Sequence, residues 1–596
     1  MNYKKNVIVC MIFMLQLLSF NNSIAEKIEW VKNFGGIKDE HIDHVVVCSN
    51  NDIIVIGTFS DTMIFKSGSQ NLDTLICENE YEDVFIVKFH SHGSFQWATS
   101  IAHGPQSYDW WLFPSVDPDG NLFLSGTFIG DVTIGKNEEN EISFSSLEEN
   151  SLDIFLTKIL DDGEIDWARK LGDVEQESVR DIDTDDKGSV YITGRFWENS
   201  ILLPGGMNED ITLIGNATSY SIFTTKYDKD GNIKWAEKIL SDYDMMSYSI
   251  TVSKTGKVAI GGYFSESIYL NSDINSDTLI SHGVADIFIA TYDSNGVYLW
   301  ATSDGGTEFE MASDIEFDSQ ENIIVTGSFH GMFIMGDVDT LRSDNSFHDV
   351  MDDIFLAKYD SEGHYLWSLR EGGSMLDGGE HIQIFKNDKI LLSGFYWYEA
   401  TFSKGKKSSK LVSNIADTCS HFEAKYTADG DLYWVADVDS SFTTFNTVMA
   451  VDSSENMIRA GEYFGNVNIE SEDNALPVSG IGGFDIYLAK FVASPTTIKN
   501  INRLIRDIKL DQNYPNPFNP VTVINYSVGA IHELPVQVDL SIYNSLGQKV
   551  CTLISEKQNP GHYSVAWNAS EFASGIYYSR LKSDTNSQVK KMLLIK

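Results

Sequence analysis

The sequence predicts an all-β protein: a seven-bladed β-propeller closed by an N-terminal strand, followed by a small C-terminal β-sandwich. Strand-forming residues dominate, and Asn, Asp, Gly and Ser interrupt them at short intervals, which is typical of all-β chains. Beyond the N-terminus, no long stretch has the apolar periodicity of a helix. The propeller itself is predicted by two further observations, an internal repeat and a repeat unit that is divided between the two ends of the chain.

Three series of motifs share one period. Seven strands resemble DIFLAKY (353–359), and each is preceded by a GTF-like segment such as 57–59. The third series consists of seven tryptophans, and successive tryptophans are 65 to 70 residues apart. The tryptophans are Trp30, Trp97, Trp167, Trp235, Trp300, Trp367 and Trp434. Each unit contains about four core strands and a variable excursion, and four strands are what a propeller blade contains.

The two ends of the series predict that the ring closes. Trp30 has no DIF-like strand before it, and the last DIF-like strand (485–491) has no Trp strand after it. In a ring, the strand 26–30 would complete the seventh blade beside 485–491. The alternative, an open solenoid, would leave both half units as exposed edges and would need polar capping units.

The GTF strand followed by a DIFLAKYDSEGHYLW-type hairpin resembles the repeats of bacterial extracytoplasmic seven-bladed propellers, the SBBP-type family. The resemblance covers residues 26–491. It implies the propeller fold and indicates little about function.

Residues that recur in every unit are expected to be structural. The tryptophans are predicted to pack between blades. Lysine recurs at one strand position, where we expect it to pair with a nearby Asp or carbonyl while its stem packs on apolar neighbours. A ring of ligand-binding lysines is the alternative. These lysines are Lys88, Lys158, Lys226, Lys358, Lys425 and Lys490.

Acidic turns such as 117–121, 183–188 and 228–232 suggest calcium, but an EF-hand loop needs a Glu at its twelfth position. Counted from Asp183, that position is Gly194. We therefore attribute these residues to turn geometry. No cofactor is predicted, and calcium is kept only as a lesser possibility.

The connections between each Trp and the next strand vary, and they are acidic and partly aromatic. In a propeller they open on one face near the channel mouth, and a convergent face of this kind is the default binding site. Its aromatic members would supply apolar contact and its acidic members charge. The candidate ligand face consists of Asp109, Trp110, Trp111, Glu175, Tyr243, Asp244, Glu308 and Phe309.

Two functions are compatible with this pattern. The first is a secreted or surface-displayed binding, adhesion or scaffold protein without catalysis, whose ligand is an extracellular protein or a glycan. The alternative is an exported hydrolase or lyase acting on polysaccharide or peptide, with carboxylates or a metal cluster at the channel mouth. No catalytic residue is predicted, because no Ser-His-Asp order, HExxH motif or Gly-rich phosphate loop stands out.

Charge and cysteine content restrict the partners and the compartment. The formal net charge of −43 makes nucleic acid a poor partner, because phosphate binding needs a basic surface. Residues 1–25 have the basic start, apolar core and small terminal residues of a secretory signal, and no second apolar segment follows. The remaining cysteines match no zinc or redox motif and are expected to be buried apolar residues, with a Cys48–Cys77 bridge left open. A monomer is expected.

The repeat ends near residue 491, and after a linker (492–509) the composition changes. Residues 510–596 form short alternating strands that resemble the type A C-terminal sorting domain of the type IX secretion system. The resemblance implies outer-membrane export by the type IX machinery, removal of the domain, and release or surface attachment. It rests on Asn513, Tyr514, Pro515, Asn516, Pro517, Phe518, Gly547, Gly575, Ile576, Tyr577, Lys591, Leu593, Leu594, Ile595 and Lys596.

Overall fold

The chain divides into two compact units, Met1–Ala493 and Ser494–Lys596. The computed structural model describes residues 26–596 except 68–70, 78–81, 104–110, 136–140, 147–150, 173–175, 198–199, 271–276, 337, 345–350, 405–406, 414–418, 438–443, 472–473, 494–507, 511, 529–535, 546, 559–560 and 583–586. The predicted signal and most of the predicted linker lie outside this part. The described residues form strands and turns, which confirms the all-β prediction, and they include no helix that is long and apolar enough to cross a membrane.

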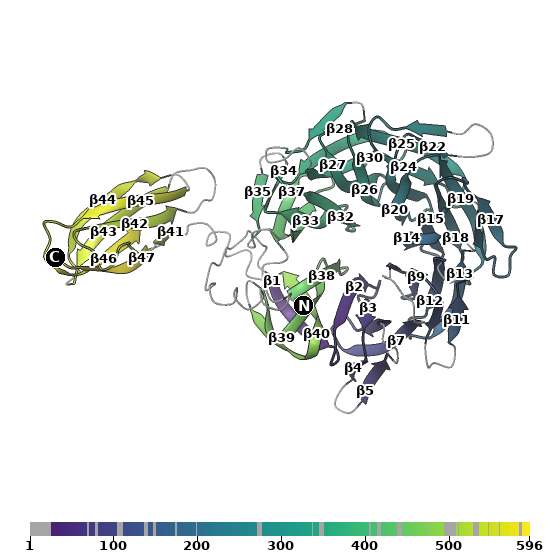
Figure 1. Ribbon diagram of the computed structural model, residues 1–596, viewed down its shortest axis with the longest axis horizontal. Helices are drawn as coiled ribbons and strands as arrows, with labels where there is room; N and C mark the ends of the chain where they lie inside the picture. Colours follow the sequence, from purple (N-terminus) through teal and green to yellow (C-terminus); the bar gives the residue numbers. More distant parts are fainter. Residues whose placement is uncertain are drawn as a thin grey trace, which may run out of the picture. The chain divides into compact units, whose positions relative to one another are not determined.

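Seven antiparallel sheets, each with four core strands, make up the first unit (Figure 1). The strands are given from the innermost outwards; sheet 1 contains β2 (Glu40–Val47), β3 (Ile53–Phe59), β6 (Asp83–Phe89) and β7 (Phe95–His103), sheet 2 contains β8 (Leu112–Val116), β9 (Leu122–Phe128), β12 (Asp153–Ile159) and β13 (Ile165–Leu171), and sheet 3 contains β14 (Glu177–Thr184), β15 (Val190–Trp197), β18 (Tyr220–Tyr227) and β19 (Ile233–Ser241). Sheet 4 contains β20 (Met245–Val252), β21 (Val258–Phe264), β24 (Asp286–Tyr292) and β25 (Tyr298–Gly306), and sheet 5 contains β26 (Glu310–Phe317), β27 (Ile323–His330), β30 (Asp352–Tyr359) and β31 (Tyr365–Glu371). Sheet 6 contains β32 (Asp377–Ile384), β33 (Ile390–Trp397), β36 (Cys419–Tyr426) and β37 (Leu432–Asp437), and sheet 7 contains β38 (Thr444–Val451), β39 (Met457–Glu470), β40 (Ala475–Ala493) and β1 (Glu26–Phe34).

The last sheet contains both ends of the first unit. β1 pairs antiparallel with β40, so that Glu26 lies opposite Ala493 and Phe34 lies opposite Ile486. This pairing confirms that the N-terminal strand completes the sheet of the last DIF-like strand. The innermost strands contact one another in the order β38, β2, β8, β14, β20, β26 and β32, around a central space (Figure 1). Between β32 and β38, the two ends of this order, the described residues make no contact of comparable extent.

Side hairpins fill the variable excursion between the second and third strands of a unit. Three of them also pair with the outermost strand of the preceding sheet, through β10–β7, β22–β19 and β28–β25. The hairpins are β4 (Thr62–Ser67) with β5 (Asn71–Ile76), β10 (Asp131–Ile134) with β11 (Ile142–Ser145), β16 (Ser200–Leu203) with β17 (Ile211–Ile214), β22 (Ser267–Leu270) with β23 (Asp277–Ile280), β28 (Met332–Met335) with β29 (Asp339–Arg342), and β34 (Glu399–Lys404) with β35 (Lys407–Val412).

The repeated tryptophans join neighbouring sheets. The Trp300 indole nitrogen donates to the carbonyl of Ser361 at 3.1 Å, in the turn of the following sheet. Gly363 of that turn has a φ of +87°, and a Cβ added there would lie 2.7 Å from the Trp300 ring. Glycine therefore serves both the left-handed turn and the ring contact. Equivalent contacts at Trp97 and Trp167 confirm that the tryptophans pack between sheets.

The repeated lysines are also structural. Lys358 lies 2.8 Å from Asp318, and the side chains of both residues are nearly fully buried. Lys490 and Asp452 form the same contact at 2.8 Å. Pairs with a carboxylate or a carbonyl are found at all six positions, which confirms the predicted structural role.

The acidic turns bind their own backbone. Asp185 Oδ1 accepts hydrogen bonds from the N–H groups of Lys187 and Ser189 at 3.0 and 2.9 Å. Asp117 and Asp228 do the same in their turns, so the predicted turn role is confirmed. Cys48 is a buried free thiol, so the bridge that the sequence left open is not formed.

The second unit consists of two sheets around an apolar core. One sheet contains β41 (Ile508–Leu510), β42 (Val521–Val528) and β45 (Gly561–Asn568), and the other contains β44 (Lys549–Gln558), β43 (Val536–Asn544), β46 (Gly575–Lys582) and β47 (Ser587–Leu594).

The sorting motifs at the two ends of the second unit contact each other. Phe518 is buried, and its N–H donates to the carbonyl of Leu593 at 2.9 Å. Asn516 Oδ1 accepts from the Leu593 N–H at 2.8 Å. Asn513 is buried and donates to Thr522 Oγ1 at 2.9 Å. The proline-rich block therefore holds the last strand in place, which explains why both motifs belong to one module.

Candidate ligand face and central channel

The innermost strands share a β-bulge. In six of the seven sheets the register with the second strand shifts by one residue at the same point, and in five of them a single residue is left without a partner. A bulge re-aims the extra side chain, and bulges are frequent beside functional sites. The bulged residue thus differs from one of these five sheets to the next. The bulged residues are Asp43, Arg180, Tyr248, Ser313 and Glu380.

In two neighbouring sheets, the second strand carries a residue of the same type as the bulged residue and close to it. Arg195 is paired with Ser178, next to the bulged Arg180, in sheet 3. Tyr263 is paired with Met246, close to the bulged Tyr248, in sheet 4. The two pairs are close enough to interact electrostatically, and together they form a basic and aromatic surface.

The two arginines lie over aromatic rings. The guanidinium carbon of Arg180 is 4.3 Å from the centre of the Trp111 ring, and that of Arg195 is 4.2 Å from the centre of the Tyr220 ring. Such cation–π contacts contribute about 0.5–2 kcal/mol each. Arg195 Nε donates to Ser178 Oγ at 3.3 Å, whereas Arg180 Nε is buried with no hydrogen-bond partner among the described residues.

The two cations are crowded, and neither forms an ion pair with a described carboxylate. Burial and, to a smaller extent, the positive charge of Arg195 lower the pKa of Arg180 to about 10. Arg370 and Arg459 lie within 4.0 Å of carboxylates, but in the described part of the chain Arg180 and Arg195 have no such partner. A negatively charged group would therefore be stabilised here. We name this surface the arginine–aromatic cluster: Trp111, Arg180, Arg195, Tyr220, Tyr248, Tyr263 and Phe309.

The structure brings part of the predicted ligand face into this cluster. Trp111 is 45% exposed, and Phe309 is 36% exposed and lies 5.1 Å from the Tyr263 ring. Asp244 accepts a hydrogen bond from the Tyr263 hydroxyl at 2.8 Å. Tyr243 is exposed, and its N–H donates to Ser241 Oγ at 3.0 Å.

The remaining predicted face residues contribute less or cannot be placed. Glu308 is exposed and receives a long hydrogen bond from the Thr307 hydroxyl, at 3.4 Å. Asp109, Trp110 and Glu175 lie outside the described residues. Sequence reasoning missed the two arginines; the available signal was the middle residue of the GTF-like series, which is Arg195 in one unit and Thr58 in the first.

Carboxylates of the innermost strands, which we call the channel acids, connect neighbouring sheets. The innermost strand of a sheet is an edge strand, so its outer N–H groups need acceptors. Asp181 Oδ2 accepts from the Ile250 N–H at 2.8 Å, and Asp314 Oδ2 accepts from the Ile382 N–H at 2.7 Å. Burial raises the pKa of Asp183 to about 7, and the nearby charge of Asp314 raises it further. These contacts give the channel acids a structural role.

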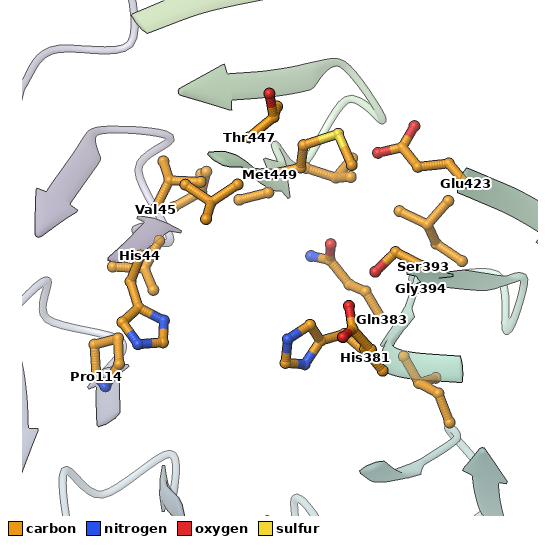
Figure 2. A pocket seen from close by; sticks show the side chains of 18 of the residues that line it. His44, Val45, Pro114, His381, Gln383, Ser393, Gly394, Glu423, Thr447 and Met449 are labelled. Atoms are coloured by element: carbon orange, nitrogen blue, oxygen red, sulfur yellow. The ribbon is translucent and has the colours of Figure 1, made fainter. Parts of the chain in front are cut away.

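A cavity of about 680 Å³ opens between the strands β2 and β8 on one side and β32, β33 and β38 on the other. His44 and His381 extend into it from opposite sides (Figure 2). Burial and the charge of His381 lower the pKa of His44 to about 4, so its imidazole is neutral at pH 7. Within the described ranges, no group of three or more His, Cys, Asp or Glu side chains is arranged to hold a metal ion.

Comparisons with known proteins locate the export signal. Residues 512–596 match the secretion system C-terminal sorting domain family. This domain directs the protein through the type IX secretion system to the cell surface or the extracellular space. The matched range contains the proline-rich block and the final strand that contact each other in the second unit.

The repeat region is similar to a WD repeat protein. An uncharacterized WD repeat-containing protein of Acanthamoeba polyphaga mimivirus is 22% identical over 576 residues, which covers 84% of this chain and 41% of that protein. The chain thus spans less than half the length of this relative. The similarity is consistent with a strand-rich repeat protein.

Proposed function

We propose that the protein is a secreted or surface-attached, non-catalytic binding protein and that its ligand occupies the arginine–aromatic cluster. The observation that carries the proposal is the pair Arg180 and Arg195, two guanidinium groups that pair with no carboxylate in the described part of the chain and lie beside exposed rings, in a chain of net charge −43. Arg, Tyr and Trp are the residues that dominate binding surfaces.

The proposed architecture is a closed seven-bladed propeller of the SBBP type over residues 26–491, after a signal segment (1–25). The linker (492–509) and the sorting domain (510–596) follow. Seven four-stranded sheets, with one sheet shared by both ends, support this reading. In a closed ring, the bulged residues of all sheets would converge on one face, and the cluster would lie beside the channel mouth.

The chemistry of the cluster favours an acidic glycan over the other ligand classes. A guanidinium fork binds a carboxylate through two parallel hydrogen bonds. Trp111 and Phe309 offer flat apolar faces, and a binding site that combines such faces with a few fixed polar groups suits a ring-shaped ligand. The Tyr248 and Tyr263 hydroxyls lie close to the same arginines and add polar contacts.

A glycan array that includes uronic-acid polysaccharides tests this proposal with the full secreted chain. We expect wild-type binding that falls at least tenfold in Trp111→Ala and in Arg180→Gln. Tyr433→Ala, which removes an exposed aromatic ring outside the cluster, is the matched control and should bind normally. Equal binding by all variants would contradict the assignment of the site.

A second candidate is a hydrolase that uses the channel carboxylates, which the raised pKa of Asp183 favours. We prefer the binding function because backbone donors of neighbouring sheets already engage these carboxylates. Cleavage products released from a bound glycan by the wild type, and lost in Asp183→Asn, would favour the hydrolase instead.

A further inference from the structure

Three residue types recur together around the repeated tryptophan. The pattern D-x13-W-x4-G-x4-[D/E] occurs at 153–177, 286–310 and 353–377. A fourth copy is divided between the ends of the chain, with Asp485 in the last sheet and Trp30, Gly35 and Glu40 at the start. The units of Trp235 and Trp434 lack all three partners of the tryptophan. They carry Ser221, Leu240 and Met245, and Ser420, Asp439 and Thr444, at the same positions.

The structure shows what joins these positions. The Asp begins the third strand of one sheet, and the second acid begins the innermost strand of the next sheet, so the two carboxylates meet between sheets. A Cβ added to Gly35 would lie 2.2 Å from Asp485 Oδ1 and 2.6 Å from Glu40 Oε2. At Gly172 the corresponding distances to Asp153 Oδ1 and Glu177 Oε2 are 2.6 and 2.9 Å.

Glycine is required because any side chain would occupy the space between the two acids. Gly372 has a φ of +121°, and a Cβ there would lie 2.7 Å from Asp353 Oδ1 and 2.8 Å from Asp377 Oδ2. In three copies the glycine thus lies between the two carboxylates, whereas in the copy at 286–310 Gly305 lies against Asp286 and Gly306 against Glu310. We call the space beside each such pair of acids a compartment.

Two of the four compartments contain their own cation. Lys170 Nζ lies 3.0 Å from Asp153, and the Arg370 guanidinium lies 2.7 Å from Asp353. Both cations are the third residue after the tryptophan. In the other two copies that position holds Asn33 and Ser303, which carry no charge.

The first compartment without an internal cation contains an unpartnered oxygen. Glu40 and Asp485 are fully buried. Asp485 Oδ1 lacks a hydrogen-bond partner among the described residues, and Asp485 Oδ2 accepts from the Ile481 N–H at 2.8 Å. The backbone N–H of Gly36 faces the Glu40 carboxylate and partly offsets the effect of burial on its pKa. Burial raises the pKa of Glu40 to about 8, and the charge of Asp485 contributes to the rise.

The second compartment has the same arrangement. Asp286 and Glu310 are fully buried, and Asp286 Oδ1 and Glu310 Oε1 lack a partner in the described structure. Their other oxygens accept from the N–H groups of His282 and Gly306, at 3.0 and 2.8 Å. The exposed His282 ring also contacts Asp286 Oδ2, at 3.0 Å, and leaves the inner oxygen unpaired.

We infer that the Glu40–Asp485 and Asp286–Glu310 compartments each bind one calcium ion, in the place that Lys170 and Arg370 take in the other two. A main-chain carbonyl of the following side hairpin completes each site. Thr62 O and Glu40 Oε1 lie 2.0 and 3.0 Å from a Cβ added to Gly36, and Met332 O and Glu310 Oε1 lie 1.8 and 3.1 Å from one added to Gly306.

Calcium is the cation that suits this donor set. It accepts carboxylate, carbonyl and water oxygens in a flexible geometry, whereas magnesium demands a near-ideal octahedron. Two carboxylates neutralise its charge fully. The sites do not resemble the acidic turns that first suggested calcium, because there the carboxylates are already satisfied by backbone N–H groups.

Calorimetric titration of the full chain with calcium chloride, after removal of metals with EDTA, tests the inference. We expect two ions per chain in the wild type, one in Glu40→Gln, one in Glu310→Gln, and none in the double variant. Asp377→Asn, in the compartment that contains Arg370, is the matched control and should still bind two. Magnesium chloride at the same concentration should give no comparable binding.

If a carboxylate variant does not fold, a second pair of variants tests the inference by adding a cationic side chain to one compartment and removing it from another. Ser303→Lys places an ammonium where Lys170 stands in its own unit, so the variant should bind one calcium ion and stay folded in EDTA. Lys170→Ser should conversely gain a third site. A wild-type chain that binds no calcium, or a stoichiometry that Ser303→Lys leaves at two, would overturn the inference.

Discussion

Buried carboxylates are stabilised in three different ways in this protein, and their surroundings decide how each behaves. Asp318 pairs with Lys358, and Asp181 accepts a backbone hydrogen bond from the neighbouring sheet. Glu310 faces Asp286 without an internal cation. An unpaired buried carboxylate is costly as an anion, so it either keeps a proton or binds a cation.

Glu310 should make the stability of the metal-free protein depend on pH. Burial raises its pKa from 4.5 to about 8. The folded state therefore holds a proton that the unfolded state releases, and the stabilisation present below pH 4.5 is lost as the pH rises to 8. Each unit of pKa difference corresponds to about 1.4 kcal/mol.

Thermal unfolding in EDTA at pH 5, 6, 7 and 8 checks this expectation. The melting temperature of the wild type should fall over this range, and in Glu310→Gln it should fall less steeply because the amide does not titrate. Calcium should remove most of the difference between pH 5 and pH 8. Parallel pH profiles for the two proteins in EDTA would contradict the assigned protonation.

Single residues of the site were only partly predictable from the sequence. Trp111 and Phe309 were predicted because an aromatic residue in a variable connection between repeat units can be recognised in the sequence alone. Arg180 and Arg195 were missed, because a bulge in one strand and the register with its neighbour bring them together. The pair Glu40 and Asp485 is separated by almost the whole first unit, so only the ring arrangement reveals it.

At the scale of elements, the strand β1 determines how the first unit ends. It covers the outer edge of β40, which would otherwise present unpaired N–H and C=O groups. The repeat count predicted this pairing, because one half unit remained at each end. The fixed Lys and Trp positions likewise predicted the inter-sheet contacts. The bulges were not predicted, because no residue type marks them.

Removal of residues 26–34 from the chain should expose the β40 edge. We expect a lower melting temperature by circular dichroism and concentration-dependent light scattering from strand pairing between molecules. A chain that lacks only residues 26–27 leaves most of the β1–β40 ladder in place and serves as the control. A truncated protein that melts like the wild type and stays dispersed would show that β1 is dispensable.

At the scale of the whole molecule, the sorting signal and the proposed ligand site belong to different units. The sorting domain at 512–596 directs export, and the arginine–aromatic cluster lies in the first unit. The second unit is not acidic: from residue 497 onwards the chain has eleven Lys and Arg against seven Asp and Glu. The two units thus differ in the sign of their net charge.

Deletion of residues 512–596 should retain the protein inside the outer membrane. Cell fractionation and surface labelling should find the truncated chain in the periplasm, with no signal at the surface or in the medium. A milder variant, Phe518→Ala, loosens the contact with Leu593 and should reduce export without abolishing synthesis. Continued surface display of the deletion variant would argue against the sorting role.

The pairing of β1 with β40 also determines when sheet 7 can be completed during synthesis. During synthesis, β1 leaves the ribosome first among the described strands, and its partner follows only after residue 475. Sheet 7 therefore stays incomplete until nearly all of the first unit exists, and such distant pairing is slow to form. The sorting domain is made directly afterwards. Sheet 7 can thus be completed only at about the time when the sorting domain is synthesised.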